Sequence, residues 1–144
     1  MIPINPLKSF IFDNEGVIVN TDWDRVARLA HHSVGIPLLS GEEFKAALQL
    51  GEISVPNHLT KYNKGEITSK DFWSEVLAYV QQPATSHHIG LMQSALEELT
   101  TDVDQQTIAV LQKLQPSYPL FLLSNATPEI AYANRRRHTY FDYF

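Results

Sequence analysis

Two carboxylates follow the first apolar run of this 144-residue chain. Asp13 comes directly after the apolar residues, Glu15 stands two positions later, and Gly16 follows. Two carboxylates on a turning backbone can divide the work of a reaction, because one can attack or bind a metal ion while the other moves a proton. The same letters also suit a surface turn, since Asp, Asn and Gly are common turn formers. This segment alone therefore leaves a catalytic strand end and a plain turn both open.

A second segment has the same layout and favours the catalytic interpretation. Another apolar run ends in Ser124 and Asn125, and Thr127, Pro128 and Glu129 then have the types expected at the N-cap, first position and first turn of a helix. A hydroxyl, an amide and free N–H groups at a helix N-terminus form a natural anion site. If the two strands are parallel neighbours, a nucleophile lies beside a phosphate site at one sheet edge.

These segments resemble the first two motifs of the haloacid dehalogenase-like (HAD) hydrolases, a superfamily of aspartate-nucleophile phosphatases. An apolar strand followed by Asp-x-Asp-Gly-Val/Thr is matched by residues 12–17 (FDNEGV), and a strand ending in Ser-Asn by residues 122–125 (LLSN). Residues 140–142 (YFD) are similar to a sequence that often precedes the next core strand of that family. Residues 64–67 and 72–73 look like cap sequence of sugar-phosphate phosphatase relatives. The resemblance implies an α/β fold, with a partial Rossmann-like parallel-sheet core and an all-helical cap insertion.

The resemblance also implies a reaction and a set of site residues. Asp13 is the expected nucleophile, giving an aspartyl-phosphate, and Glu15 is the expected acid and base. Mg²⁺ is the expected cofactor, held by the Asp13 carboxylate and the backbone carbonyl of Glu15. The expected phosphate-binding residues are Asn14, Gly16, Ser124 and Asn125. The predicted function is therefore a Mg²⁺-dependent phosphatase of small phosphorylated metabolites.

Apolar periodicity places the elements around these motifs. A first strand is predicted over residues 8–13 and a second after Pro119, with a core helix over 104–115. Between them, five helices are predicted over residues 21–34, 40–50, 56–64, 68–82 and 86–99, the first of them capped by Thr21. We therefore expect an incomplete core of residues 1–20 and 100–144 and a helical cap of residues 21–99. Five large side chains of the cap are expected to pack on one another: Trp23, Phe44, Phe72, Trp73 and Met92.

Composition excludes several other classes of protein. A hydrophobic content of 44% supports one ordinary core, and the absence of cysteine excludes disulfides and thiolate metal sites. The formal charge of −5 offers no footprint for nucleic acid, and the basic run 135–137 is explained by its place at a helix C-terminus. The histidine pairs at 31–32 and 87–88 diverge on helices and are expected to be solvated. With no membrane span or signal pattern, we expect a cytoplasmic protein whose partner is a small phosphorylated substrate.

Three features depart from the HAD pattern. Glu15 stands where these phosphatases usually have Asp, Asn20 stands where many capped relatives have a further Asp, and the family's later Lys and Asp residues are not found after the second motif. Lys113 precedes that motif and cannot replace the Lys. We expect a fragment of a longer hydrolase, whose missing C-terminal half or a second copy covers the core.

Two other functions stay open. One is a truncated, catalytically inactive HAD relative that acts as a binding or assembly module. The other is a 2-haloacid dehalogenase, which is disfavoured because Glu15 keeps a proton-transferring carboxylate that halide departure does not need. A receiver-type domain is disfavoured by the long helical insertion.

Overall fold

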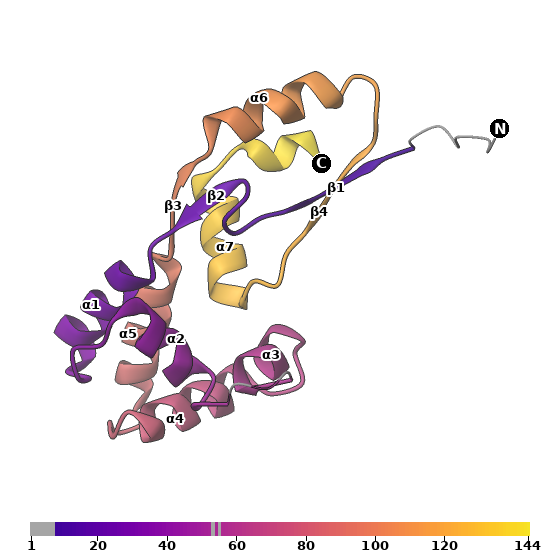
Figure 1. Ribbon diagram of the computed structural model, residues 1–144. Helices are drawn as coiled ribbons and strands as arrows, with labels where there is room; N and C mark the ends of the chain where they lie inside the picture. The colour runs from indigo at the N-terminus through magenta and orange to yellow at the C-terminus, as the bar shows by residue number, and fades with distance from the viewer. Residues whose placement is uncertain (1–7, 53, 55) are drawn as a thin grey trace.

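The computed structural model describes residues 8–52, 54 and 56–144. Residues 1–7, for which the sequence predicts no signal pattern, lie outside the described residues. The elements in chain order are β1 (Phe10–Asp13), β2 (Val19–Thr21), α1 (Trp23–Val34), α2 (Gly41–Leu48), α3 (His58–Asn63), α4 (Ser69–Tyr79), α5 (Ser86–Glu97), β3 (Thr100–Val103), α6 (Gln105–Leu114), β4 (Leu120–Leu123), α7 (Pro128–Arg137) and the 3₁₀ helix η1 (Tyr140–Tyr143). The fold is α/β, as predicted, with α1–α5 grouped apart from the strands, α6, α7 and η1 (Figure 1).

The two motif strands are parallel neighbours. Along β1 and β4, Phe10 faces Leu120 and Asp13 faces Leu123, so both chains leave the sheet at the same edge. This confirms the parallel pairing on which the sequence argument depended. Parallel strands are usually buried on both faces, yet Ile11 and Phe121 are 69% and 53% exposed in this pair.

A second pair of strands joins the two groups of elements and was not predicted. β2 and β3 are antiparallel and shifted in register between Val19 and Thr21, and Thr21 pairs with Thr100. The predicted N-cap at Thr21 is therefore wrong: Thr21 ends a strand, and the side chain of Asp22 caps α1 by accepting from the Arg25 N–H at 2.8 Å. Three- and four-residue strands with polar letters carry too little periodicity to be recognised.

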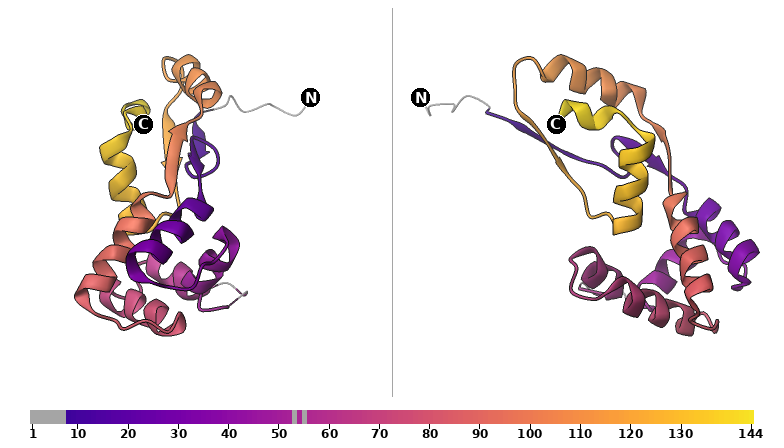
Figure 2. Two further views of the ribbon diagram at one scale, coloured as in Figure 1. Left: turned by 90° about the vertical axis from the view of Figure 1, so that its left-hand side faces the viewer. Right: turned by 180° about the vertical axis from the view of Figure 1, so that it is seen from behind.

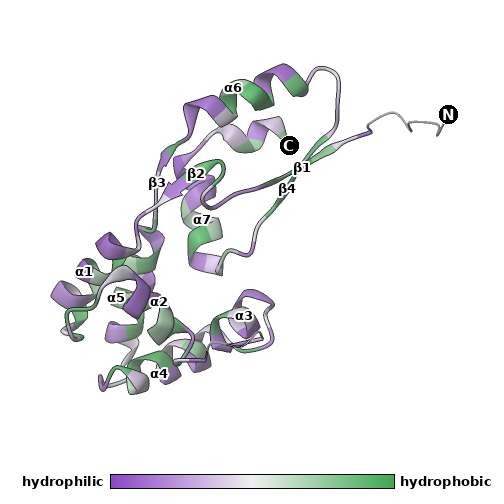
Figure 3. Cartoon of the chain, viewed as in Figure 1, coloured by the Kyte–Doolittle hydropathy of each residue, from purple (hydrophilic) through white to green (hydrophobic). Residues whose placement is uncertain are grey.

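The cap helices follow local capping signals closely. Ser40 and Glu43 form the predicted capping box of α2, and the hydroxyl of Thr68 caps α4. Apolar and polar residues alternate around these helices (Figure 3). Four of the five large side chains expected to pack together are fully buried: Phe44, Phe72, Trp73 and Met92. Trp23 differs, because it is only partly buried against this cluster.

The core has its own, smaller hydrophobic cluster, and α7 packs against the cap cluster. The buried members of the small cluster are Ile18, Val19, Leu111, Leu120 and Tyr140. Thr127 caps α7 with Pro128 in its first turn, as predicted. Ile130 of α7 belongs to the cap cluster, and both views of Figure 2 show α7 reaching toward the cap. The division into residues 1–20 and 100–144 against 21–99 stays a prediction.

The basic run lies in the last turn of α7, as predicted, and it also contacts other elements. Arg137 pairs with the Glu98 carboxylate and donates to the Glu97 carbonyl at 2.8 Å, which ties α7 to the end of α5. Arg136 lies 5.2 Å from the centre of the Tyr132 ring. The basic run therefore takes part in intramolecular contacts. None of the helices in the described part of the chain has the length and apolarity that a membrane crossing requires.

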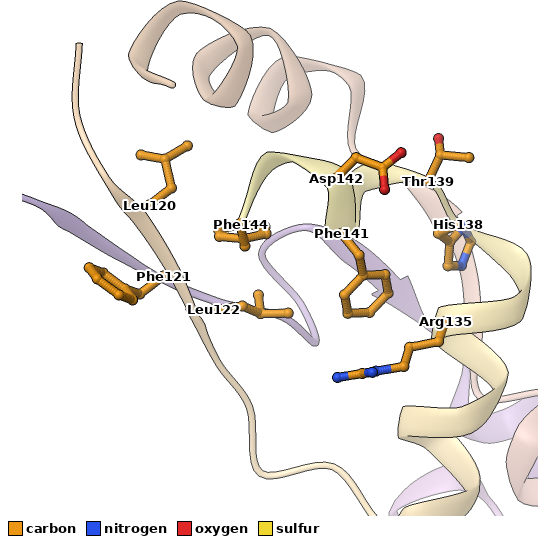
Figure 4. A pocket seen from close by; sticks show the side chains of 9 residues that line it. All are labelled: Leu120, Phe121, Leu122, Arg135, His138, Thr139, Phe141, Asp142 and Phe144. Carbon is orange, nitrogen blue, oxygen red and sulfur yellow. The ribbon is translucent and has the colours of Figure 1, made fainter. Parts of the chain in front are cut away.

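A hollow of about 610 Å³ opens beside β4 and η1. Figure 4 shows its lining side chains, among them Arg135, which lies over the ring of Phe141 at 5.8 Å. The other lining residues are Leu120, Phe121, Leu122, His138, Thr139, Asp142 and Phe144. None of the six residues predicted for chemistry lines this hollow, so its size does not mark it as the catalytic site.

A candidate active site between the core and the helical cap

A smaller cavity of about 320 Å³ contains the predicted nucleophile. We call it the interface cavity, because both the core and the cap contribute to its wall. The core residues are Asp13, Glu15, Asn125, Ala126, Thr127 and Ile130, and the cap residues are Thr21, Trp23, Lys45, Leu59, Asn63 and Leu99. The structure thus brings the two carboxylates of the first motif and Asn125 of the second to one place.

Asp13 is the last residue of β1, and its side chain is exposed. Its Oδ1 atom accepts a hydrogen bond from the N–H of Asn14 at 2.7 Å, which holds the carboxylate against its own turn. No described cation pairs with Asp13 in the structure. An exposed carboxylate with a free oxygen at the end of a strand is available to attack a ligand or to bind a metal ion.

The turn after Asp13 uses most of its own N–H groups. The Asn14 carbonyl accepts from the N–H groups of Val17, Ile18 and Val19 at 3.2, 2.9 and 3.2 Å. Gly16 has a φ of +79°, which glycine adopts readily, and its N–H donates to the Val19 carbonyl at 2.8 Å. Gly16 is therefore needed for the shape of the turn. Its predicted phosphate binding stays a prediction, and its N–H is engaged within the turn in this arrangement.

Glu15 is held by donors from three elements. Its Oε2 atom accepts from the Ser124 hydroxyl at 2.7 Å, and its Oε1 atom accepts from the side-chain amides of Asn14 at 2.8 Å and Asn134 at 3.3 Å. All three donors are uncharged. A carboxylate fixed in this way has a defined position, which a group that transfers protons requires.

The side chain of Asn14 lies beneath the turn and does not face the interface cavity. It is 2% exposed, and its Oδ1 atom accepts from the Tyr140 hydroxyl at 2.6 Å. Burial raises the pKa of Tyr140 to about 12, with the hydrogen bond to Asn14 opposing this shift and the charge of Glu15 adding to it. Tyr140 thus remains a neutral donor that holds the Asn14 side chain in place, and the Asn14 amide in turn positions the Glu15 carboxylate. This arrangement makes Asn14 a support for Glu15, and its predicted phosphate binding stays a prediction.

Asn134 is a second support that the sequence did not reveal. It is fully buried on α7, and its Oδ1 atom accepts from the Thr100 hydroxyl at 2.6 Å while its amide donates to Glu15. A usable signal was present, because asparagine is a weak helix former and Asn134 falls four positions after Ile130 on the buried face. A polar residue on that face needs partners.

Ser124 and Asn125 lie where the second motif was expected. Ser124 is exposed and is bound to Glu15, so β1 and β4 are linked at their ends. The Asn125 carbonyl accepts from the Asn63 amide of the cap at 2.6 Å. Phosphate binding by Ser124 and Asn125 stays a prediction, supported by their position at the edge that also bears Asp13.

The site offers oxygen ligands of the kind that a hard cation prefers, but only a few of them. No group of three or more metal-binding side chains is found among the described residues. Mg²⁺ is commonly held by one or two carboxylates together with water and substrate phosphate, and Asp13 and Glu15 lie in one cavity. These residues therefore fit a weakly anchored Mg²⁺ that relies on its phosphate ligand. None of the histidines of the two pairs lines the interface cavity, and His31 and His88 each contact a backbone carbonyl.

Comparisons with solved structures agree with this geometry. A HAD family enzyme from Bacteroides thetaiotaomicron, in complex with magnesium and inorganic phosphate, superposes with a TM-score of 0.68 at 19% identity, covering 96% of this chain and 66% of that one. The HAD-hydrolase YfnB from Bacillus subtilis, bound to magnesium, gives 0.64 at 18% identity, covering 95% and 62%. L-2-haloacid dehalogenase from Xanthobacter autotrophicus gives 0.55 at 22% identity, covering 96% and 54%.

The chain therefore has the fold of the HAD hydrolases, as the sequence motifs predicted. It spans about three fifths of the length of the solved structures that it matches. No family model matches the sequence, and no curated protein matches it.

Proposed function

We propose that this chain carries the nucleophile, the acid–base group and the cap of a Mg²⁺-dependent HAD phosphatase that acts on small phosphate monoesters. The observation that carries the proposal is the placement of Asp13 and Glu15 in one cavity, with Glu15 fixed by Ser124 from the neighbouring parallel strand. Polar groups at the carboxyl edge of parallel strands, beneath a cap, mark the usual ligand position of such folds.

The reaction follows from the positions of the two carboxylates. An Asp13 oxygen attacks phosphorus while the bond from phosphorus to the ester oxygen breaks, and Glu15 gives its proton to that leaving oxygen. Glu15 then takes a proton from water, whose oxygen attacks the same phosphorus and releases inorganic phosphate and free Asp13. Each proton and electron pair is accounted for by these two residues and one water.

Mg²⁺ is proposed as the cofactor. Asp13 and the backbone carbonyl of Glu15 would hold it, and when bound it neutralises charge on the transferring phosphoryl group. Ser124, Asn125 and the turn around Asn14 and Gly16 are proposed to contact the phosphoryl oxygens. The magnesium and phosphate named for the Bacteroides thetaiotaomicron structure support this assignment by analogy of fold.

The helical cap is proposed to exclude water and select the substrate. It contributes Thr21, Trp23, Lys45, Leu59, Asn63 and Leu99 to the interface cavity, so a ligand there contacts both parts of the chain. Exclusion of bulk water strengthens the electrostatic contacts of the site. The chain spans only part of the length of the structures that it matches, so the activity of a whole hydrolase is itself part of this proposal.

Dehalogenation is the alternative enzyme activity, and the fold match to a haloacid dehalogenase favours keeping it. Its chemistry also begins with attack by aspartate. It gives no task to Glu15, whereas Glu15 receives three hydrogen bonds in this structure. Because these hydrogen bonds fix the position of a carboxylate that dehalogenation does not use, they favour phosphate ester cleavage.

The test is phosphate release from p-nitrophenyl phosphate by the purified chain, with and without Mg²⁺. We expect release by the unaltered chain, none by Asp13→Asn, and a loss of about 100-fold or more for Glu15→Gln, because general acid–base catalysis contributes on that order. Chloride release from 2-chloropropionate is measured alongside. Chloride release without phosphate release would show the dehalogenase, and a folded chain that does neither would leave the binding module.

A further inference from the structure

Lys45 is a cap residue to which the sequence analysis gave no role, and it lines the interface cavity together with Asp13 and Glu15. Among the described residues that line this cavity it is the one basic side chain, beside two acidic ones. No described carboxylate lies within ion-pairing distance of its ammonium group. A partly buried lysine without a counter-charge, in a cavity, is a ready site for an anion.

The packing of α2 on α1 sets the position of Lys45. The N–H of Gly41 donates to the Asp24 carboxylate at 2.6 Å, and a Cβ on Gly41 would lie 2.7 Å from the Asp24 nitrogen. Only glycine allows this approach. Because Gly41 and Lys45 are four positions apart on one helix, they share a face, and the close contact turns Lys45 toward α1 as well.

An aromatic ring holds the ammonium group in the cavity wall. The Nζ atom of Lys45 lies 5.9 Å from the centre of the Trp23 ring, within the range of a cation–π contact. Trp23 is the first residue of α1 and lines the cavity itself. It is only partly buried, whereas the other large cap side chains are fully buried.

The rest of the cavity wall is mixed in polarity. Leu59, Leu99 and Ile130 line it together with the uncharged polar side chains of Thr21, Asn63, Asn125 and Thr127. A ligand that fills the cavity therefore meets the carboxylates of the core, with any bound cation, and an ammonium group from the cap. A short carbon chain with an anionic group at each end matches these contacts.

We propose that Lys45 binds a second anionic group of the substrate, a carboxylate or a second phosphate, so that the substrates are small phosphate monoesters with a further negative charge. The assignment rests on the proposed function for its catalytic end. The Lys45 contact itself is a binding property and holds with or without turnover.

The test is calorimetric binding to the purified chain without Mg²⁺, with three probes. The phosphate monoester of β-hydroxypropionate is compared with isopentyl phosphate, which has the same shape but methyl groups in place of the carboxylate oxygens. Propanediol bisphosphate distinguishes a preference for a second phosphate. Lys45→Met and Lys45→Arg are compared with Lys70→Met, which removes an equal charge from an exposed cap position outside the cavity.

We expect Lys45→Met to weaken the carboxylate or bisphosphate probe by about tenfold or more, the usual size of a charged hydrogen bond. Isopentyl phosphate should change by less than about twofold, Lys45→Arg should keep most of the affinity, and Lys70→Met should match the unaltered chain. Equal weakening of all three probes by Lys45→Met would show that Lys45 holds the phosphoryl group instead, and no change in any probe would remove it from the site. Both results overturn the inference.

The same measurements separate this inference from the proposed function. Lys45-dependent binding by a chain that releases no phosphate would leave the anion site intact and refute the phosphatase. Phosphate release that does not distinguish the charged probes from isopentyl phosphate would support the phosphatase and refute the anion site at Lys45.

Discussion

The Ser124 hydroxyl donates a hydrogen bond to the Glu15 carboxylate at 2.7 Å, and this contact joins two residues that lie just after β4 and β1 and are 109 positions apart in sequence. Both motifs of the proposed site thus act on one carboxylate. Ser124 has two candidate tasks, to position Glu15 and to contact phosphate, and substitution can separate them.

Ser124→Ala should lower kcat for phosphate release by about tenfold or more, since a hydrogen bond to a charged group contributes about 1.5–3 kcal/mol. The measurement is kcat and KM for phosphate release, with Ser124→Thr as the control that keeps the hydroxyl. A fall in kcat with an unchanged KM supports the positioning of Glu15, whereas a rise in KM alone would assign Ser124 to phosphate binding.

Asn134→Ala should destabilise the fold by about 1–3 kcal/mol, because the buried Thr100 hydroxyl loses its acceptor and Glu15 loses a donor. Urea unfolding followed by circular dichroism measures the change. Asn20→Ala, at an exposed position of β2, is the control and should stay within about 0.5 kcal/mol of the unaltered chain. Equal effects of the two variants would contradict a supporting role for Asn134.

Features that depend on local signals were predictable from the sequence. Capping residues such as Ser40 and Thr127 bind backbone groups three positions away. Each of the two motifs is a short contiguous sequence and can be recognised directly. The family resemblance implied a parallel sheet, and the pairing of β1 with β4 confirms it although the two strands are distant in sequence.

Features that depend on distant contacts were not predictable. Lys45 is one of several cap lysines, and nothing nearby in sequence shows that it lines the cavity of Asp13. Asn134 meets Glu15 across 119 positions, and β2 meets β3 across most of the cap. Such contacts are set by how elements pack, which periodicity does not determine.

Two glycines in cap helices should respond to the same substitution in opposite ways. Gly41→Ala should cost about 1–3 kcal/mol, because the added methyl group would overlap Asp24 and Trp23 at 2.7 Å. Gly90→Ala should stabilise the chain by up to about 1 kcal/mol, since Gly90 lies inside α5 with open space around it and alanine favours helix. Urea unfolding of both variants is the measurement. A stable Gly41→Ala variant would refute the close approach of α2 to α1 that positions Lys45.

The contact between Tyr62 and Glu129 predicts how stability changes at alkaline pH. The Tyr62 hydroxyl donates to Glu129 at 2.7 Å, and its ring stacks on Phe72 with centres 4.1 Å apart. Burial raises the pKa of Tyr62 from 10.0 to about 12, with the Ser69 hydrogen bond opposing the shift and Glu129 adding to it. The neutral phenol is thus favoured in the folded chain.

A raised pKa fixes the sign of the pH dependence. Between pH 10 and about 12 the unfolded chain loses the Tyr62 proton while the folded chain keeps it, so the stability contributed by this group is complete below pH 10 and is lost as pH rises toward 12. Tyr62→Phe should therefore flatten the fall in unfolding free energy across that window, whereas Tyr79→Phe, at a half-exposed ring, should leave it unchanged. Urea unfolding at a series of alkaline pH values measures both slopes. Tyr140 has a similarly raised pKa, so some decline should remain in Tyr62→Phe, and an unaltered slope in that variant would contradict the buried contact with Glu129.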